Sequence, residues 1–341
     1  MIAPLPAIDV VIIGINVRSY LAECIASIRA ADYPQELLTI TYVDGGSGDS
    51  SVAIAREACI RVIELNDPHP TPGRGRNAGL FVSDAPFVQF MDADTLLDRN
   101  WLRSALPHFT DKIVAVCGKR SERRPDMNNF HIIASVEWHY EQGPCRYFGG
   151  DFLARREPLA AAGGFDDLLI AGEEPDFSVR LRHDDWVIQR IAAAMTLHDL
   201  NMTTFRQYWK RAFRSGHAYA EVGLRYLTTS ERLWTRELVR VTVTALLPLL
   251  SVILGTLFRQ PLLGLLLALI VALKPLLRIP RVMKYYKISF GTAFLYTLHT
   301  AFVVYPQFLG VLRYLVTRCG GAPLRNRGQR LPDRSSPEKS P

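Results

Sequence analysis

Short apolar runs alternate with helix-like stretches along residues 1–120. The apolar runs are short, rich in β-branched side chains and followed by turn residues, which is typical of buried strands. The predicted strands are residues 8–14, 37–43, 61–65, 86–91 and 113–117. The predicted helices are residues 20–30, 50–58, 75–82 and 100–109. This alternation predicts an α/β domain with a mainly parallel sheet flanked by helices, in which ligands bind at the carboxyl ends of the strands.

The pattern changes at residue 203. Residues 203–236 predict a basic amphipathic helix with Phe205, Trp209 and Phe213 on its apolar stripe. Such a helix suits a membrane surface, although it also fits a surface helix packed on the domain. Three runs without Lys, Arg, Asp or Glu follow, at 241–258, 260–273 and 288–312. Because a crossing takes roughly 20 apolar residues, the first and third qualify as transmembrane helices and the second is marginal.

Charge is distributed as unevenly as hydrophobicity. Residues 238–341 contain 14 basic and two acidic side chains, whereas residues 1–237 contain 26 basic and 31 acidic ones. This division is not typical of a nucleic-acid-binding protein and indicates a soluble domain with a membrane anchor oriented by its flanking charges. The five cysteines are scattered and never form CxxC, which favours a reducing compartment. No signal peptide is recognised, so we expect the front half in the cytoplasm.

Two carboxylates follow the fourth predicted strand. Asp92 and Asp94 flank Ala93 directly after residues 86–91. Paired carboxylates at the carboxyl end of a buried strand can share Mg²⁺ or Mn²⁺ with a phosphate-bearing ligand. The same spacing also caps turns and helices, so this motif alone leaves both interpretations open.

Three other polar segments lie at the ends of predicted elements. In DGGSGDS, residues 44–50, Asp44 stands at a strand edge where a base or ribose could bind, and Asp49 or Ser50 can cap the next helix. In GRGRNAG, residues 73–79, arginines near a helix start suit a pyrophosphate. A dinucleotide fingerprint is excluded there, because it should follow the first strand. In GEEPD, residues 172–176, the acids also fit a helix N-terminus without any function.

In this order, the segments resemble the inverting family-two glycosyltransferases. The series is DGGSGDS, GRGRNAG, DAD, FGG…RR…GGFDD and GEEPDFSVRLR, within about residues 7–215. The resemblance implies a GT-A fold, which is a Rossmann-like nucleotide-binding domain. It also implies a nucleotide-diphosphate-sugar donor and Mg²⁺ or Mn²⁺ as cofactor. On the same resemblance, Asp44 would contact the donor base and Arg76 would lie near the donor. Asp92 would lie near the ribose, phosphate and metal, and Asp94 would bind the metal.

The acid pair of the family falls on Glu173 and Glu174, and Glu174 inherits the role of general base. The resemblance places the acceptor or diphosphate region at Asp151, His198, Gln207, Trp209 and Arg211. Several positions depart from the family pattern. Gly45 replaces an acid, the base is Glu rather than Asp, and the Gln/Trp/Arg cluster is not the Gln-x-x-Arg-Trp of processive synthases.

These features predict a membrane-anchored enzyme that moves a sugar from a nucleotide-diphosphate-sugar, with a UDP-sugar as the leading choice of donor. The acceptor is expected to be a hydroxyl of a lipid-linked glycan for a bacterial cell-surface or exported polysaccharide. The alternatives are a polyprenyl-phosphate glycosyltransferase, a processive polysaccharide synthase and a catalytically dead membrane scaffold. The intact DAD motif and acid pair argue against the scaffold. Nucleic acid is not an expected partner, whereas membrane lipids are.

The predicted domains are a cytoplasmic GT-A domain (1–202), amphipathic interface helices (203–237), about three membrane segments (238–318) and a disordered basic tail (319–341). We expect a multi-pass protein of the inner, cytoplasmic membrane, with the basic loop 274–287 on the cytoplasmic side. The side of the tail stays open. Residues 288–312 could cross once, or Pro306 could divide them into a re-entrant pair.

Overall fold

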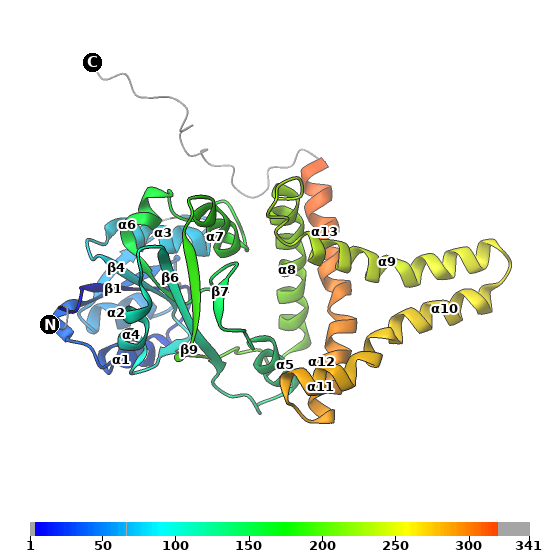
Figure 1. Cartoon of the computed structure of the whole chain (residues 1–341), viewed down its shortest axis with the longest axis horizontal. Coiled ribbons are helices and arrows are strands. Elements are labelled where there is room, and N and C mark those ends of the chain that lie inside the picture. The colour runs from blue at the N-terminus through cyan, green and yellow to red at the C-terminus, as the bar shows by residue number, and fades with distance from the viewer. Residues whose placement is uncertain (1–3, 66, 320–341) are drawn as a thin grey trace, which may run out of the picture.

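The computed structural model describes residues 4–65 and 67–319, which form a sheet domain with a group of apolar helices beside it (Figure 1). The first half of the domain consists of β1 (Ile8–Gly14), α1 (Leu21–Arg29), β2 (Leu38–Asp44), α2 (Ser51–Glu57), β3 (Arg61–Glu64), α3 (Pro72–Val82) and β4 (Phe87–Asp92). The second half consists of β5 (Thr95–Leu97), α4 (Trp101–Ala105), β6 (Ile113–Glu122), α5 (Asn129–Glu137), β7 (Gly143–Cys145), β8 (Phe152–Arg155), α6 (Arg156–Ala161), α7 (Glu173–His183) and β9 (Val187–His198). The strands and helices predicted up to residue 117 are confirmed, with ends that differ by a few residues.

The nine-stranded sheet has the order β3-β2-β1-β4-β8-β6-β9-β5, and β7 pairs with β9. The first four strands in this order are parallel, as predicted. β8 is antiparallel to β4 and β6, while β5 and β7 are antiparallel to β9. The sheet is therefore mixed rather than mainly parallel. The sequence pattern misses these strands because three of them are too short to show a period, and because the apolar run 191–195 of β9 does not alternate with polar residues.

Apolar side chains of β1 alternate between the two faces of the sheet, as the pleat requires. Val10 and Ile12 belong to the cluster covered by α1, α2 and α4. Val11 belongs to the cluster on the other face, which α3, α6 and α7 cover and which includes Phe90 and Phe152. With both faces covered, the carboxyl-terminal edge of the sheet stays open to a ligand.

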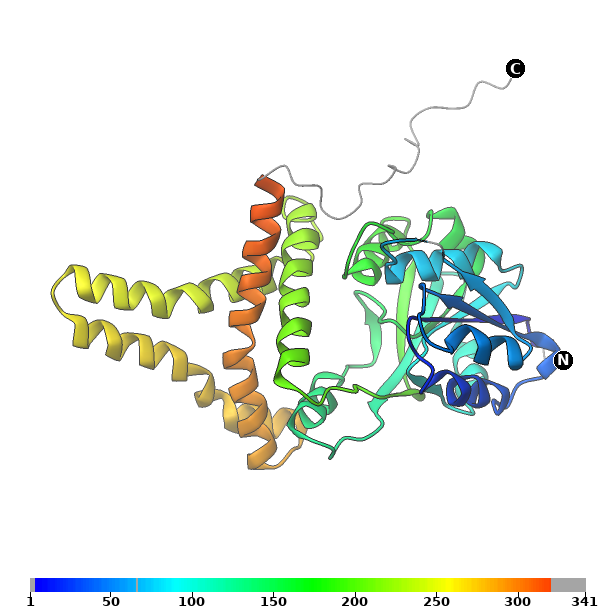
Figure 2. The same cartoon turned by 180° about the vertical axis from the view of Figure 1, so that it is seen from behind.

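The helical part follows the domain. It consists of α8 (Phe205–Arg225), α9 (Thr235–Leu257), α10 (Pro261–Leu273), α11 (Ile279–Tyr286), α12 (Phe290–Phe302) and α13 (Val304–Cys319). α9 and α10 form a hairpin that projects away from the sheet domain, and α12 and α13 run one after the other along α8 (Figure 2). Among the described residues, three helices are long and apolar enough to cross a membrane: Thr235–Leu257, Pro261–Tyr286 and Phe290–Cys319. The predicted disordered tail lies outside the described residues, apart from Cys319.

The Gly118→Ala variant should destabilise the domain. A Cβ at Gly118 of β6 would lie 2.7 Å from the carbonyl oxygen of Ala193 and would also overlap Trp101. Overpacking of this kind costs about 1–3 kcal/mol, so the midpoint of chemical unfolding, followed by tryptophan fluorescence of the full-length protein, should fall. Gly48→Ala is the control, because nothing lies within 4 Å of its added Cβ. Equal midpoints for the two variants would contradict this packing.

Candidate active site

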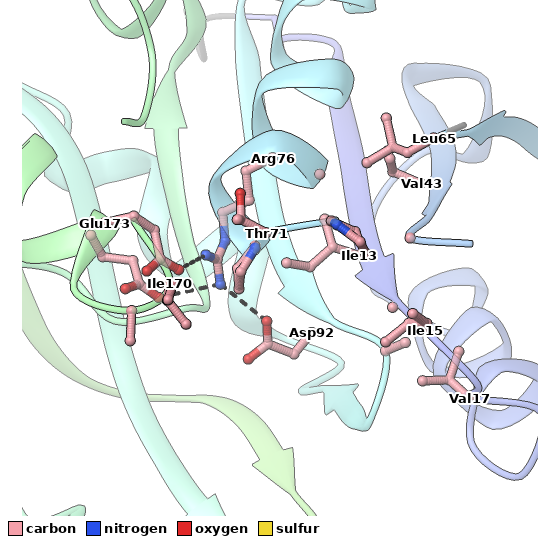
Figure 3. A pocket seen from close by; sticks show the side chains of 18 of the residues that line it. Ile13, Ile15, Val17, Val43, Leu65, Thr71, Arg76, Asp92, Ile170 and Glu173 are labelled. Atoms are coloured by element: carbon pink, nitrogen blue, oxygen red, sulfur yellow. Dashed lines mark hydrogen bonds and ion pairs between the residues drawn. The ribbon is translucent and has the colours of Figure 1, made fainter. Parts of the chain in front are cut away.

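A cavity of about 470 Å³ opens at the carboxyl ends of β1, β2 and β4 (Figure 3). Gly14, Val43 and Asp92 stand at these strand ends and line it. The start of α3 and the start of α7 form the facing wall, and Arg214 of α8 reaches it from the helical part. This is the edge at which an open α/β sheet offers a ligand the ends of several strands.

Arg76 lies at the centre of a network of charged side chains in this cavity (Figure 3). Its Nη1 is 2.8 Å from Glu173 Oε1, and its Nη2 is 3.3 Å from Glu174 Oε1 and 3.1 Å from Asp92 Oδ1. The Arg76 side chain is only 3% exposed. One buried guanidinium therefore joins the acid pair of α7 to the carboxylate at the end of β4, and fixes the distance between them.

The arginines of GRGRNAG do not stand at an open helix start. α3 begins at Pro72, where its fixed backbone angle is favourable, and Thr71 Oγ1 caps the helix by accepting a hydrogen bond from the N–H of Arg74 at 3.2 Å. The guanidinium of Arg74 pairs with Asp67, and that of Arg76 with the acids of the cavity. Both side chains therefore already have anionic partners, and a contact between Arg76 and the donor stays a prediction.

Glu173 and Glu174 differ in their surroundings. The side chain of Glu173 is 4% exposed and that of Glu174 is 18% exposed. Burial, assisted by repulsion from Glu174, raises the pKa of Glu173 to about 8, and the attraction of Arg76 opposes that rise. Glu174 is thus the member of the pair that is more accessible from the cavity.

Asp92, Asp94 and His198 come together as a candidate metal site. One ligand atom from each lies within 4.8 Å of the others, and His198 Nε2 is 3.4 Å from Asp94 Oδ1. β5 places His198 there, because Thr95 pairs with it on β9. Asp94 Oδ1 is buried and has no hydrogen-bond partner among the described residues. This position lets the atom bind a cation.

The electrostatics of the cluster also fit a divalent cation. Burial and then repulsion from Asp92 raise the pKa of Asp94 to about 7. Burial and then the charge of Arg120 hold the pKa of His198 well below its usual value, so the imidazole is neutral, as a ligand must be. The carboxylates suit a hard divalent cation, and the neutral imidazole is a ligand that transition metals also accept.

Asp151 supports this cluster from behind rather than facing the cavity. It is 2% exposed, its Oδ1 accepts a hydrogen bond from the N–H of Asp92 at 3.2 Å, and its Oδ2 accepts one from Thr196 Oγ1 at 2.7 Å. Arg120 lies 3.7 Å from Asp151 and 3.6 Å from Asp92. The arrangement fits a positioning role, which differs from the acceptor contact expected for Asp151.

Asp44 shapes the turn after β2. Its Oδ2 accepts hydrogen bonds from the backbone N–H groups of Gly46 at 2.8 Å and Ser47 at 2.7 Å. The neighbouring Val43 and Gly45 line the cavity, while Asp44 itself is 2% exposed. A contact between Asp44 and the donor base stays a prediction.

The three α8 residues predicted for the acceptor region lie apart from this cavity. Gln207 closes a capping box with Thr204 at the start of α8. Trp209 packs against Phe302, and Arg211 lines a smaller pocket between α5, α8 and α12. Of the residues predicted for the acceptor region, His198 is the one whose side chain lies beside the carboxylates of Asp92 and Asp94.

Two residues of the site escape the sequence analysis. Arg214 lines the cavity from α8, and Arg120 lies behind Asp92. Arg214 stands on the polar side of the predicted amphipathic helix, and this periodicity is the one available signal. Arg120 carries no local signal, because it depends on the pairing of β6 with β9.

Comparisons with known proteins relate part of the chain to a family and most of it to a known fold. Residues 9–159 match the family model described as Glycosyl transferase family 2. The pre-mycofactocin glycosyltransferase of Mycobacterium tuberculosis is 27% identical over 235 residues, which cover 64% of this chain and 48% of that protein. The glycosyltransferase AglE of Haloferax volcanii is 21% identical over 237 residues, which cover 65% of this chain and 76% of that protein. The chain thus spans about half the length of the mycobacterial relative it matches.

The fold is also that of a solved structure. The mannosyltransferase PcManGT from Pyrobaculum calidifontis, determined in complex with GDP-Man and Mn²⁺, superposes with a TM-score of 0.62 at 14% identity. The match covers 92% of this chain and 88% of that one, so it includes most of the helical part. These matches support a glycosyl transferase family 2 domain with a GT-A-like fold, followed by apolar helices.

Proposed function

We propose that this chain is a membrane-anchored, metal-dependent glycosyltransferase. It moves a sugar from a nucleotide-diphosphate-sugar, with UDP-sugars as the first choice, to a hydroxyl of a lipid-linked glycan. One observation carries the proposal. The carboxylates of Asp92 and Asp94 and the acid pair Glu173–Glu174 line one cavity on either side of Arg76, within a family-two domain.

Asp92, Asp94 and His198 would hold the divalent cation. When bound, a divalent cation offsets the negative charge that develops on a diphosphate leaving group. The protein contributes the rigid placement of its own ligands, since Asp151 and the β5–β9 pairing hold the DAD turn in place. Val43, Gly45 and Leu65 line the opposite end of the cavity and would enclose the base and ribose.

Glu174 would act as general base. Its carboxylate faces the cavity and is held by Arg76, which orients one oxygen and leaves the other for the acceptor. Removal of the acceptor's proton as the hydroxyl attacks contributes typically about 10²–10⁴-fold to the rate. Attack from this side, opposite the diphosphate, inverts the anomeric carbon.

The apolar helices support a lipid-linked acceptor. An enzyme whose acceptor is carried on a membrane lipid gains encounters by being confined to the same surface. We propose that residues 1–202 form the cytoplasmic catalytic domain, 203–237 the interface helices and 238–318 the membrane part, at the inner membrane of a bacterium that makes a surface or exported polysaccharide. This assignment is supported by the three long apolar helices and by the basic loop 274–287.

Nucleotide-sugars with Mn²⁺ should raise the thermal unfolding midpoint of the full-length protein in detergent. A ligand at 100 times its dissociation constant adds about 2.7 kcal/mol of stability. A panel of UDP-, GDP- and dTDP-sugars identifies the donor, and EDTA should abolish both the shift and the slow hydrolysis of that donor. If no sugar nucleotide shifts the midpoint, with or without metal, the proposed donor class is wrong.

Asp94→Asn should remove metal-dependent transfer. The variant loses a ligand charge with little change in shape, so kcat should fall roughly 100-fold or more while the unfolding midpoint without ligand stays the same. Asp111→Asn, at an exposed acid away from the cavity, is the control. Unchanged kcat and Mn²⁺ dependence in Asp94→Asn would exclude Asp94 as a metal ligand.

Glu174→Gln should keep donor and metal binding and lose turnover. An amide cannot accept the proton of the acceptor, so kcat should fall about 10²–10⁴-fold at an unchanged donor affinity. Glu173→Gln should cost less, because Glu173 is buried against Arg76 and its amide can still accept a hydrogen bond from the guanidinium. Steady-state kinetics with the acceptor varied distinguish the two, and the opposite ranking would assign the base to Glu173.

Arg214→Gln should weaken binding of the nucleotide-sugar. Its guanidinium is the cation that α8 contributes to the cavity, and a hydrogen bond to a charged group is worth about 1.5–3 kcal/mol, or roughly tenfold to a hundredfold in the dissociation constant. Arg206→Gln, on the same helix but outside the cavity lining, is the matched control. If calorimetry gives the same nucleotide-sugar affinity for both variants and the wild type, Arg214 does not contact the donor.

A further inference from the structure

The third long apolar helix differs from the other two in its packing. Within the most apolar part of Phe290–Cys319, 44% of the residues are buried in the protein, against 17% in Thr235–Leu257 and in Pro261–Tyr286. α13 packs along α8, whereas α9 and α10 pack mainly on each other. The first two helices are therefore free to contact lipid on most sides, and the third is not.

Two glycines join α13 to α8 at backbone contact. A Cβ at Gly216 of α8 would overlap the carbonyl oxygen of Gln307, and a Cβ at Gly310 of α13 would overlap that of Phe213. Backbone contact at both crossing points packs α13 tightly against α8. The depth of α13 in a membrane is therefore limited by the depth that α8 can reach.

α8 cannot lie within the hydrocarbon core of a bilayer. Arg206, Lys210 and Arg214 are exposed and, among the described residues, have no ion pair. Arg214 also lines the catalytic cavity, which must be open to a water-soluble donor. A bare cationic side chain within the core is strongly disfavoured, so α8 lies at the water side of the membrane surface.

α12 is likewise fixed to the catalytic domain through polar contacts. His299 Nε2 lies 3.0 Å from Glu137 Oε1 of α5, and His299 Nδ1 lies 2.9 Å from the hydroxyl of Tyr208 of α8. His299, Thr297 and Gln307 are all buried on this inner side. These three polar residues of the third helix therefore face the protein, whereas Arg313 and Arg318 near its end are exposed.

The opposite side of α12 and α13 is apolar and uncovered. Its exposed large apolar residues recur at helical spacing and are Phe290, Phe294, Leu298, Phe302, Leu309, Leu312, Leu315 and Val316. Figure 1 shows this rod running across the base of the α9–α10 hairpin, with the sheet domain on the other side of α8. A helix with one apolar face and one face held by a water-exposed partner is typical of the membrane interface.

The hairpin has the dimensions of two crossings. At 1.5 Å per residue, Arg240 at the base of α9 and Arg259 at the tip lie about 28 Å apart, and Arg259 and Arg278 are separated by about the same length of chain. The hydrocarbon core of a bilayer is about 30 Å thick. Close contact of Gly255 with Gly264 brings the two helices together, as small residues do in membranes.

We propose that the α9–α10 hairpin crosses the bilayer twice, and that α12 and α13 do not cross but lie with α8 in the membrane surface on the side of the catalytic domain. This topology rests on the membrane anchoring proposed above and specifies its form. The lipid bilayer is the partner of the uncovered apolar face. Cys319 then lies on the same side as the catalytic domain, and the hairpin tip at Gln260 lies on the opposite side.

Cysteine accessibility in sealed membranes tests the topology with three single reporters. Cys59 of the catalytic domain and Cys319 are native and exposed, and Gln260→Cys places a thiol at the tip. In each variant the other exposed cysteines and Cys145 are replaced by Ser, while the buried Cys24 and Cys117 stay to preserve the core. A variant without any of the three reporters measures background labelling.

A membrane-impermeant maleimide should label Cys59 and Cys319 only in inside-out vesicles, and Gln260→Cys only in spheroplasts. If Cys319 reacts on the same side as Gln260→Cys, the third helix crosses and its surface placement is wrong, although anchoring stands. If Gln260→Cys reacts on the side of Cys59, the hairpin does not cross. Release of the protein by alkaline carbonate would instead refute membrane anchoring itself, before any question of topology.

A charge scan gives an independent measure. Leu250 of α9 and Leu309 of α13 are 46% and 44% exposed, so they are a matched pair. Leu309→Lys should leave the carbonate-resistant yield within about twofold, since a lysine at the interface reaches water. Leu250→Lys should reduce it severalfold, because its charge falls near the middle of the bilayer. Equal losses would place α13 in the hydrocarbon core and overturn the proposal.

Discussion

The buried guanidinium of Arg76 is the interaction on which the rest of the site depends. It is enclosed by carboxylates from β4 and α7, and no other contact of comparable strength links the end of the sheet to the start of α7 among the described ion pairs of the cavity. Removing one partner of a buried ion pair typically costs about 3–5 kcal/mol, so the position of α7 follows that of α3. The geometry of the acid pair is therefore set from inside the domain.

The same network gathers acidic side chains at one end of the cavity. Its four acids are Asp92, Asp94, Glu173 and Glu174, with Arg76 between them and Arg120 3.6 Å from Asp92. Burial and repulsion from a neighbouring acid raise the pKa of Asp94 to about 7 and that of Glu173 to about 8. Under the proposed function, a divalent cation at Asp92, Asp94 and His198 would favour the charged carboxylates there and would let an anionic donor approach them.

The sequence predicts the parts of the fold that are recorded in local patterns. β1, β2 and β4 are evident from their β-branched and apolar residues, and the DAD turn from its position after β4. The role of Arg76 is not evident, since Glu173 lies 97 positions away and nothing near either residue indicates the pair. His198 likewise reaches Asp94 through the pairing of β5 with β9, a three-residue strand with no visible period.

Hydropathy alone also treats the third apolar helix like the first two, because it counts composition and not partners. Gly216 and Gly310 allow backbone contact that joins α13 to α8, a helix carrying cations. Because of this contact, the apolar run of α13 is interpreted as a surface helix and not as a crossing. α8 then has a double role. Arg214 of this helix lines the candidate active-site cavity, and another side of the helix packs on α13, whose outer face is apolar. In the proposed topology, only α8 and α13 would separate the donor site from the membrane surface, which is a short distance for an acceptor that is held by its lipid.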